Sequence, residues 1–395
     1  MSKGLIYGIA LFLFAIIPLF DFINVYGAGG RYSIFIRAVF LFVVLLGALK
    51  TKENIQIIFT AILAILFGTF ISFFNLLTGT ISEVEFSENI IFLIKIFSLP
   101  IYCCFFSSLS LHRKMKVYKV SMVVIFCYVS AVIIGAVFSI EYLSNYGETE
   151  RFGFKGIISA GNETASFFLI ALFWACTVHL KKQSLISLFF LCLVIVGSLM
   201  TGTKSAILMN VILLTAIAYK RFGLKAFVFH APAFLSVFFI SIYIFYLNLS
   251  PLALLVDGSI AYFKFQLSNS ASGNWLTLLL SGRDYKLEQV WSGFIAQHPQ
   301  SLILGGYPFG RYSVEMDFFD LIFTAGGVLT SIYCVLVFEV LRKNQFLKKG
   351  PNRPINVSFL LAIFVVSFFG GHFLYSGVGV IFLALFFTVL NRNEC

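Results

Sequence analysis

The sequence predicts an all-α polytopic membrane protein with about twelve transmembrane helices and one large outer loop that contains amphipathic helices. Three observations predict this class. Hydrophobic residues make up 60% of the 395 residues and charged residues only 11%, against about 25% charged residues in soluble domains. Apolar runs that approach the roughly 20 residues needed to cross a bilayer recur along the chain. Basic residues concentrate in alternate connections between these runs, as expected when positive charge stays on the cytoplasmic side.

Twelve apolar runs are the predicted elements in chain order. They lie near residues 4–20, 34–49, 55–77, 90–110, 120–140, 163–180, 184–200, 205–219, 226–247, 318–341, 356–371 and 374–390. The last two could instead form one re-entrant unit around residues 370–379. We interpret the first run as a span, since its apolar stretch ends well before Gly27 and Ala28, where a signal peptide would be cleaved. No polar stretch is long enough for a soluble domain, so residues 1–395 are predicted to form one integral membrane domain.

The charge pattern predicts the orientation. With a cytoplasmic N-terminus, the inner connections hold most of the 28 Lys and Arg residues, but among the acidic residues only Glu53, Glu339 and Glu394. Both termini are therefore predicted to lie inside. The outer side then carries a smaller loop at about 141–162 and a large loop at about 248–317. The net charge of +11 is explained by the inner connections, and the absence of a basic stripe interleaved with aromatic residues argues against a nucleic-acid partner.

The large outer loop is predicted to contain an amphipathic helix that starts near Ser281 and ends before Pro299. Its apolar residues recur at helical spacing: Leu287, Val290, Trp291, Phe294 and Ile295. Ser281 and Asp284 have the spacing of a capping box, with Asp in place of the usual Glu or Gln. The stretch 252–267 is a candidate for a second interfacial helix. Such helices lie on the membrane surface or cover the bundle.

Cationic side chains in the outer loops are candidate ligands of a phosphorylated substrate. Arg151 and Arg283 are each separated by nine residues from a glycine, Gly161 and Gly293. The planar guanidinium group matches phosphate oxygens two at a time. Weaker candidates for the same role are Lys155, Lys204 and Arg311. Lys95 lies inside the fourth predicted span, where a charge either has a function or pairs within the bundle.

Four segments together resemble the O-antigen polymerase (Wzy type) and O-antigen ligase superfamily of bacterial envelope enzymes. They are RFGFKGIISAGNETASFFLI, LMTGTKSAIL, SGRDYKLEQVW followed by LILGGYPFG, and VEMDFFDLIFTAGGVL. Polymerases of this family are described as carrying paired Arg-x10-Gly loops in the third and fifth outer loops. Arg151 and Arg283 fall in these loops, with a spacing shorter by one residue. Ligases typically show a His-Asn pair where this chain has Glu315 and Asp317, which favours a polymerase.

The resemblance implies an inner-membrane glycosyltransferase of surface polysaccharide and lipopolysaccharide biosynthesis, with its active site facing the periplasm. It would join undecaprenyl-diphosphate-linked oligosaccharide repeat units, one as donor and one as acceptor, and would work beside membrane lipid, a flippase and a chain-length regulator. Arginines would stabilise the leaving diphosphate, so that no metal ion and no cofactor is expected. Glu315, Asp317 and His372 are the candidates for the base that activates the acceptor hydroxyl.

Each site residue also has a purely structural interpretation. Arg151 can pair with Glu148 or Glu150, and Arg283 can be a charge on a helix surface. Glu315 and Asp317 can anchor the interface, and His372 can form a hydrogen bond at a helix end. The competing functions are an O-antigen ligase that transfers glycan to the lipid A core, a transporter or flippase of lipid-linked oligosaccharide, and a membrane scaffold without chemistry.

Overall fold

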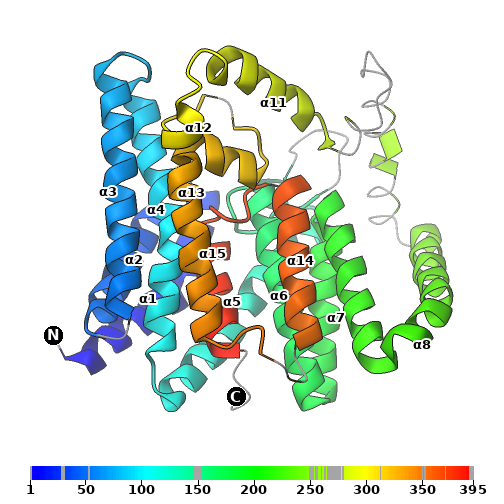
Figure 1. The fold of residues 1–395 in the computed structure, drawn as a ribbon. Coiled ribbons are helices and arrows are strands. Elements are labelled where there is room, and N and C mark those ends of the chain that lie inside the picture. The colour runs from blue at the N-terminus through cyan, green and yellow to red at the C-terminus, as the bar shows by residue number, and fades with distance from the viewer. Residues whose placement is uncertain are drawn as a thin grey trace.

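The computed structural model describes residues 2–27, 32–51, 54–145, 153–248, 281–311, 313–348, 350, 353–369 and 371–390, with isolated positions between 253 and 280. Within these ranges the chain is almost entirely helical (Figure 1). The helices are α1 (Lys3–Tyr26), α2 (Tyr32–Leu49), α3 (Ile55–Leu77), α4 (Glu83–Ser107), α5 (Leu111–Val137), α6 (Gly161–Lys182), α7 (Leu185–Met200), α8 (Lys204–Asn248), α11 (Arg283–Val290), α12 (Ser301–Leu304), α13 (Asp317–Lys343), α14 (Arg353–Phe369) and α15 (Gly379–Leu385).

Each of the twelve predicted apolar runs contains some helix, and the described residues form an all-α structure of membrane type. Seven of the described helices are long and apolar enough to cross a bilayer: α1 to α6 and α13. The apolar helices α7, α14 and α15 with its continuation are shorter. The eighth and ninth runs lie in one long helical element, α8, which bends at Gly223 (φ 73°). A positive φ is accessible to glycine at little cost, so one residue joins two helices without a loop.

Two helices begin earlier than their apolar runs predict. α4 starts at Glu83 because Ser82 and Glu85 form a capping box that satisfies the first free N–H groups. α5 starts at Leu111, and its first turns carry basic residues. Hydropathy locates the part of a helix in hydrocarbon, whereas capping and backbone hydrogen bonding extend the helix beyond it.

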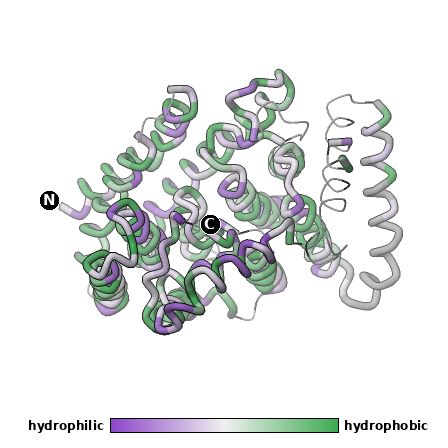
Figure 2. The backbone as a smooth tube through the Cα atoms, turned by 90° about the horizontal axis from the view of Figure 1, so that it is seen from above, coloured by the Kyte–Doolittle hydropathy of each residue, from purple (hydrophilic) through white to green (hydrophobic). Residues whose placement is uncertain are grey.

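The helices differ in how deeply they are buried. In the most apolar window of α6, 89% of the residues are buried, against 28% in α2. All residues of α15 and of the π-turn that continues it (Phe386–Leu390) are buried as well. α6 and α15 therefore form the centre of the bundle, and α2 lies at its lipid-facing side. Figure 2 shows the bundle from above, with apolar residues along its helices.

The last two apolar runs do not pack as a hairpin of equal spans. α14 packs mainly on α8, whereas α15 packs on α4 and α6. Between them, residues 371–378 have no regular helix and are mostly buried. α15 and its π-turn rise only about 18 Å, short of the hydrocarbon thickness of about 30 Å. The irregular segment 371–378, drawn in red in the interior in Figure 1, precedes α15 and is mostly buried, and backbone without regular helix is tolerated in such a helical bundle where protein surrounds it.

The amphipathic helix of the large outer loop is present as α11 and a π-turn, Trp291–Ile295. Val290, Phe294 and Ile295 are buried, as their spacing predicts. Trp291 is 51% exposed, because the wider π-turn rotates it off the buried face. The predicted capping box is wrong: the N-cap is Gly282, in the left-handed region, without a side-chain cap. Asp284 instead accepts a hydrogen bond from Thr277 (2.5 Å). The candidate helix at 252–267 lies largely outside the described residues.

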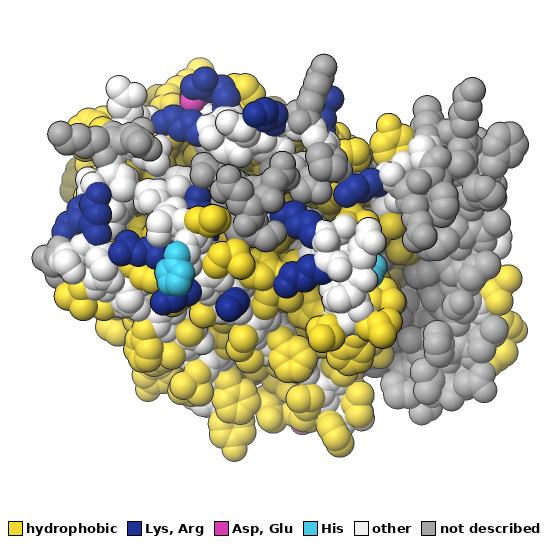
Figure 3. All heavy atoms as spheres, turned by 90° about the horizontal axis from the view of Figure 1, so that it is seen from below, with side chains coloured by type: hydrophobic (Ala, Val, Ile, Leu, Met, Phe, Trp, Pro, Cys, Tyr) yellow, Lys and Arg dark blue, Asp and Glu magenta, His cyan; other side chains and the backbone are white. Residues whose placement is uncertain are grey.

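The two ends of the bundle differ in charge. α11 and α12 cover one end (top of Figure 1), and both chain termini lie at the other. Figure 3 views that second end and shows Lys and Arg side chains gathered on it. We call it the basic end, and the end under α11 the α11 end.

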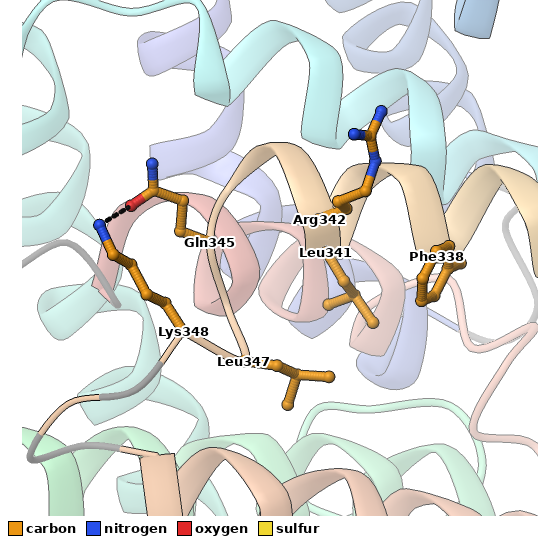
Figure 4. A pocket seen from close by; sticks show the side chains of 6 residues that line it. All are labelled: Phe338, Leu341, Arg342, Gln345, Leu347 and Lys348. Atoms are coloured by element: carbon orange, nitrogen blue, oxygen red, sulfur yellow. Dashed lines mark hydrogen bonds between the residues drawn. The ribbon is translucent and has the colours of Figure 1, made fainter.

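A cavity of about 430 Å³ lies at the basic end, where α13 finishes (Figure 4). It is lined by Phe338, Leu341, Arg342, Gln345, Leu347 and Lys348. Arg342 pairs with Glu339 (2.8 Å), and Lys348 donates to Gln345 (3.2 Å). Because α13 is about 40 Å long, this cavity lies far from the acidic residues at the beginning of the same helix.

Candidate functional site

An ion-paired group at the α11 end brings together two elements of the chain. The first turn of α11 supplies Arg283 and Lys286, and the segment before α13 supplies Glu315. The Lys286 ammonium lies 2.5 Å from Glu315 Oε1, and Arg283 Nη2 lies 3.4 Å from Oε2. The side chain of Arg283 is only 13% exposed, whereas that of Lys286 is 43% exposed. The carboxylate therefore orients two neighbouring cations, of which Lys286 is the more exposed.

Glu315 is held in its ionised form. Burial acts to raise its pKa, but the hydrogen bond from Lys286 and the charges of Lys286 and Arg283 outweigh burial and lower the pKa below its ordinary 4.5. Hydrogen bonds and opposite charges stabilise the carboxylate more than desolvation disfavours it. At neutral pH this carboxylate partly neutralises the two cations, and an incoming phosphate group would compete with it for the same donors.

His372 lies beside this group, in the buried segment 371–378. Burial is the main influence on its pKa and lowers it below the ordinary 6.5. The neighbouring carboxylates Glu163 and Glu315 act to raise this pKa, and the cations Lys95 and Arg283 act to lower it. The imidazole is therefore neutral at pH 7 and can accept a proton. Its Nδ1 lies 3.4 Å from the side-chain amide nitrogen of Asn162, a group that can present either a donor or an acceptor to the ring.

The backbone is strained at this site. Six described residues other than glycine have a positive φ, and three of them belong here: Ser281 (56°), Glu315 (62°) and His372 (64°). Gly371, also with a positive φ, packs so closely on residue 315 that a Cβ there would collide with the Glu315 carbonyl group. Such conformations persist only where the surroundings impose them, and they cluster at functional sites.

Two buried carboxylates impose this geometry. Asp317, fully buried, accepts hydrogen bonds at Oδ2 from the backbone N–H groups of Phe373 (2.9 Å) and Leu374 (3.0 Å). Asp320 accepts from the backbone N–H of Val314 (2.8 Å) and from the Tyr375 hydroxyl (3.1 Å). Together they tie the segment that carries Glu315 to the segment that carries His372. Asp317 was predicted as a candidate base. We interpret it as a positioning residue, because its carboxylate accepts hydrogen bonds from backbone N–H groups.

A second group of charges lies next to His372 inside the bundle. Of its members, the sequence analysis singled out only Lys95. Glu163 accepts a hydrogen bond from the Gly377 N–H (3.2 Å), and its Oε1 lies 3.9 Å from Lys95 Nζ. Arg37 Nη2 lies 2.7 Å from Asp21. Ser33 and Tyr128 also donate to Asp21. One feature of the sequence could have identified Arg37: like Lys95, it interrupts an apolar run, where a charge is costly unless it is paired or in a polar cavity.

The remaining predicted site residues differ in their placement. Lys204 Nζ donates to Ser281 Oγ (2.9 Å), which places it beside α11. Arg311 contacts Glu85 at 2.7 and 3.0 Å, so it ties the large outer loop to α4. Lys155 is partly exposed, and its backbone N–H donates to Leu143 (2.9 Å). Arg151 lies outside the described residues. Within the described ranges, no group of three His, Cys, Asp or Glu side chains is arranged to hold a metal ion.

Comparison of the chain with protein-family models, with curated proteins and with solved structures finds no match. The function is therefore argued from the site. The arrangement can bind an anion through Arg283 and Lys286, and it can accept a proton at the neutral His372 next to that anion.

Proposed function

We propose that the protein is a glycosyltransferase of the O-antigen polymerase type. It would join undecaprenyl-diphosphate-linked oligosaccharide units into a surface polysaccharide on the outer face of a bacterial inner membrane. The proposal includes twelve membrane crossings with both termini in the cytoplasm. The basic end in Figure 3 supports this orientation, since Lys and Arg are enriched on the cytoplasmic side. The α11 end would then face the periplasm.

One observation carries the proposal: two cations and a neutral histidine are held together at the end opposite the basic end. Arg283 and Lys286 are oriented by Glu315 (3.4 and 2.5 Å). His372 is close enough to Glu315 and Arg283 for their charges to shift its pKa. Transfer from a diphosphate-linked donor needs positive charge at the leaving group and a base at the acceptor. Both requirements meet here.

The chemistry follows from these positions. The acceptor sugar hydroxyl loses its proton to His372 Nε2, and its oxygen forms a bond to the anomeric carbon of the donor. The bond from that carbon to the diphosphate oxygen breaks, and its electron pair stays on the diphosphate. Arg283 and Lys286 stabilise this negative charge. The role of His372 requires its Nδ1–H to donate to the amide oxygen of Asn162, which leaves Nε2 free to accept the proton.

The roles of the other candidates are also part of the proposal. Glu315 orients the two cations, and Asp317 holds the segment that carries His372. Lys204 adds positive charge beside α11, and Arg151 contributes a second guanidinium from the smaller outer loop. A flippase that supplies the lipid-linked unit and a regulator of chain length are the expected partners.

The test is the surface glycan profile of a strain in which the gene is deleted and replaced by variants. The deletion and the Arg283→Gln variant should show glycans of one repeat unit, since removal of one donor to a developing charge slows such reactions by about 10²–10³. Arg342→Gln, the same change at the basic end, should restore long polymer. Normal polymer from Arg283→Gln, with the protein present in the membrane, would refute the proposed diphosphate site.

The same gel tests the competing functions. Loss of glycan from the lipid A core, with long polymer still on the lipid carrier, would show a ligase in place of a polymerase. An unchanged ladder in the deletion strain would reject both transferase activities and favour a transporter or a scaffold.

A further inference from the structure

A second cavity, of about 390 Å³, lies inside the bundle next to the site described above. It is formed by α1, α2, α4, the start of α6 and the segment 371–378. Its polar wall includes Arg37, Lys95 and Glu163, and its apolar wall includes Ile34, Ile91 and Ile94. We call it the α2–α4 cavity. Glu163 connects it to the proposed active site, since the charge of Glu163 also acts on His372.

Arg37 is oriented towards an additional ligand. Its Nη2 is bound by Asp21 (2.7 Å), a carboxylate that is only 2% exposed and also accepts from Ser33 and Tyr128. Asp21 thus fixes the position of the guanidinium group without lining the cavity, whereas Arg37 itself lines the cavity. Arg37 Nε is buried and has no hydrogen-bond partner among the described residues. The side chain of Arg37 as a whole is 15% exposed, so a ligand oxygen in the cavity can contact the part of the guanidinium group that Asp21 does not cover.

Lys95 adds a second cation to the polar wall of the cavity. It lies about 18 Å along α4 from the first residue of that helix, deep in the apolar layer. Its nearest carboxylate oxygen, on Glu163, is 3.9 Å away, and its side chain remains 37% exposed. An ammonium group at this depth is expensive unless it faces a polar cavity or a charged ligand. Guanidinium and ammonium groups both bind phosphate oxygens, and Arg37 and Lys95 line the same cavity.

The apolar wall of the cavity opens to the lipid-facing surface. Ile34 is 52% exposed, Ile91 42% and Ile94 37%, and all three lie on α2 or α4. A molecule that enters between these helices therefore passes an apolar rim before it reaches the two cations. This order of surfaces suits a lipid, with its chain in the membrane and its phosphorylated headgroup in the cavity.

We infer that the α2–α4 cavity binds the phosphate or diphosphate headgroup of a lipid, and that this lipid is the acceptor substrate. The second statement rests on the proposed function, because transfer between two lipid-linked units needs two lipid sites and the Arg283–Lys286 pair provides one. The acceptor keeps its diphosphate during transfer. Glu163 in the cavity wall suits this role, because its negative charge disfavours further charge on the headgroup while Arg37 and Lys95 hold it.

The inference is tested by native mass spectrometry of the purified full-length protein with undecaprenyl diphosphate, with phosphatidylglycerol and with diacylglycerol. The wild-type protein should bind two molecules of undecaprenyl diphosphate. Lys95→Met should bind one, and so should the double variant Asp21→Asn/Arg37→Met, which leaves no unpaired buried carboxylate. Loss of a charge-assisted hydrogen bond should weaken binding about ten- to a hundredfold. Arg342→Gln should bind two molecules, as the wild type does.

The outcomes separate this inference from the proposed function. Unchanged binding in both cavity variants, or equally tight binding of diacylglycerol, would overturn the headgroup site. Loss of phosphatidylglycerol alone from the variants would support a headgroup site for a resident phospholipid and overturn the acceptor assignment. Arg283→Gln should retain the molecule bound in the cavity. Normal polymer from Arg283→Gln would therefore refute the proposed function. The headgroup site in the α2–α4 cavity would still be judged by the lipid-binding measurements alone.

Discussion

Asp317 provides the sharpest test of how the site is built, because its two proposed roles predict different outcomes for one substitution. In the structure its Oδ2 accepts hydrogen bonds from Phe373 N–H (2.9 Å) and Leu374 N–H (3.0 Å) in a fully buried position. Asp317→Ala would leave both N–H groups unsatisfied. Each such group costs about 1–3 kcal/mol, so the variant should lose roughly 2–6 kcal/mol of the interactions that hold segment 371–378.

Asp317→Asn is the matched control. Its carbonyl oxygen can still accept from both N–H groups, and the change removes a buried charge, so a loss of about 1 kcal/mol or less is expected. If Asp317 positions His372, Asp317→Asn should keep long polymer and an apparent unfolding temperature close to that of the wild type. Asp317→Ala should reduce the amount of long polymer and lower the apparent unfolding temperature. If Asp317 were the general base, Asp317→Asn would abolish polymer as completely as Asp317→Ala.

The two readouts are the glycan ladder of the complemented deletion strain and a thermal scan of the purified protein at a fixed scan rate. A stable Asp317→Asn protein without polymer would refute the positioning role. An Asp317→Ala protein with normal unfolding temperature and normal polymer would show that these hydrogen bonds do not hold the site together.

Three further predictions follow from the structure. Gly371→Ala should reduce polymer strongly, because a Cβ would collide with the Glu315 carbonyl and a left-handed conformation costs an alanine about 1–2 kcal/mol. Gly293→Ala is the control and should retain polymer, because a Cβ at residue 293 meets open space. Equal loss of polymer in both variants would contradict the strain argument. Activity should stay constant from pH 8 to pH 6.5 and fall at a pH below 6.5, because the pKa of His372 is lowered below 6.5 and its protonation removes the base; since this pKa is lower in the folded state than in the unfolded state, its contribution to stability is present above pH 6.5 and is lost as the pH falls through the folded-state pKa, and a rate that already falls between pH 8 and pH 6.5 would contradict His372 as the base. In a cysteine-free background, Ser292→Cys should react with a membrane-impermeant thiol reagent in intact spheroplasts and Lys348→Cys only after lysis; the reverse pattern would invert the proposed topology.

Much of the helical layout was predictable from local sequence. Hydropathy located the apolar helices, including the seven described ones that are long enough to cross a bilayer, since helices that contact lipid need apolar side chains along much of their length. The spacing of Val290, Phe294 and Ile295 predicted the buried face of α11. Boundaries were less accurate where capping decided them, as at Ser82 in α4.

The composition of the site was predicted in part. Arg283 was a candidate because it is an outer-loop guanidinium group that could bind phosphate, and Glu315 and His372 were candidates for the base; the structure places the three close together. Arg311 was a weaker candidate for phosphate binding, and it pairs with Glu85. Sequence spacing gives no indication of which outer-loop cation meets a carboxylate more than two hundred residues away.

The sequence by itself determined that the chain forms apolar helices, where most of them lie, and which of their ends carry positive charge. These properties depend on residues that are neighbours along the chain. Only the tertiary structure decided that Asp317 and Glu163 accept hydrogen bonds from the segment around His372, and that Asp21 holds Arg37 beside Lys95. Such contacts arise because charged and backbone groups buried in an apolar bundle must find partners there, and helix packing determines which partners are within reach.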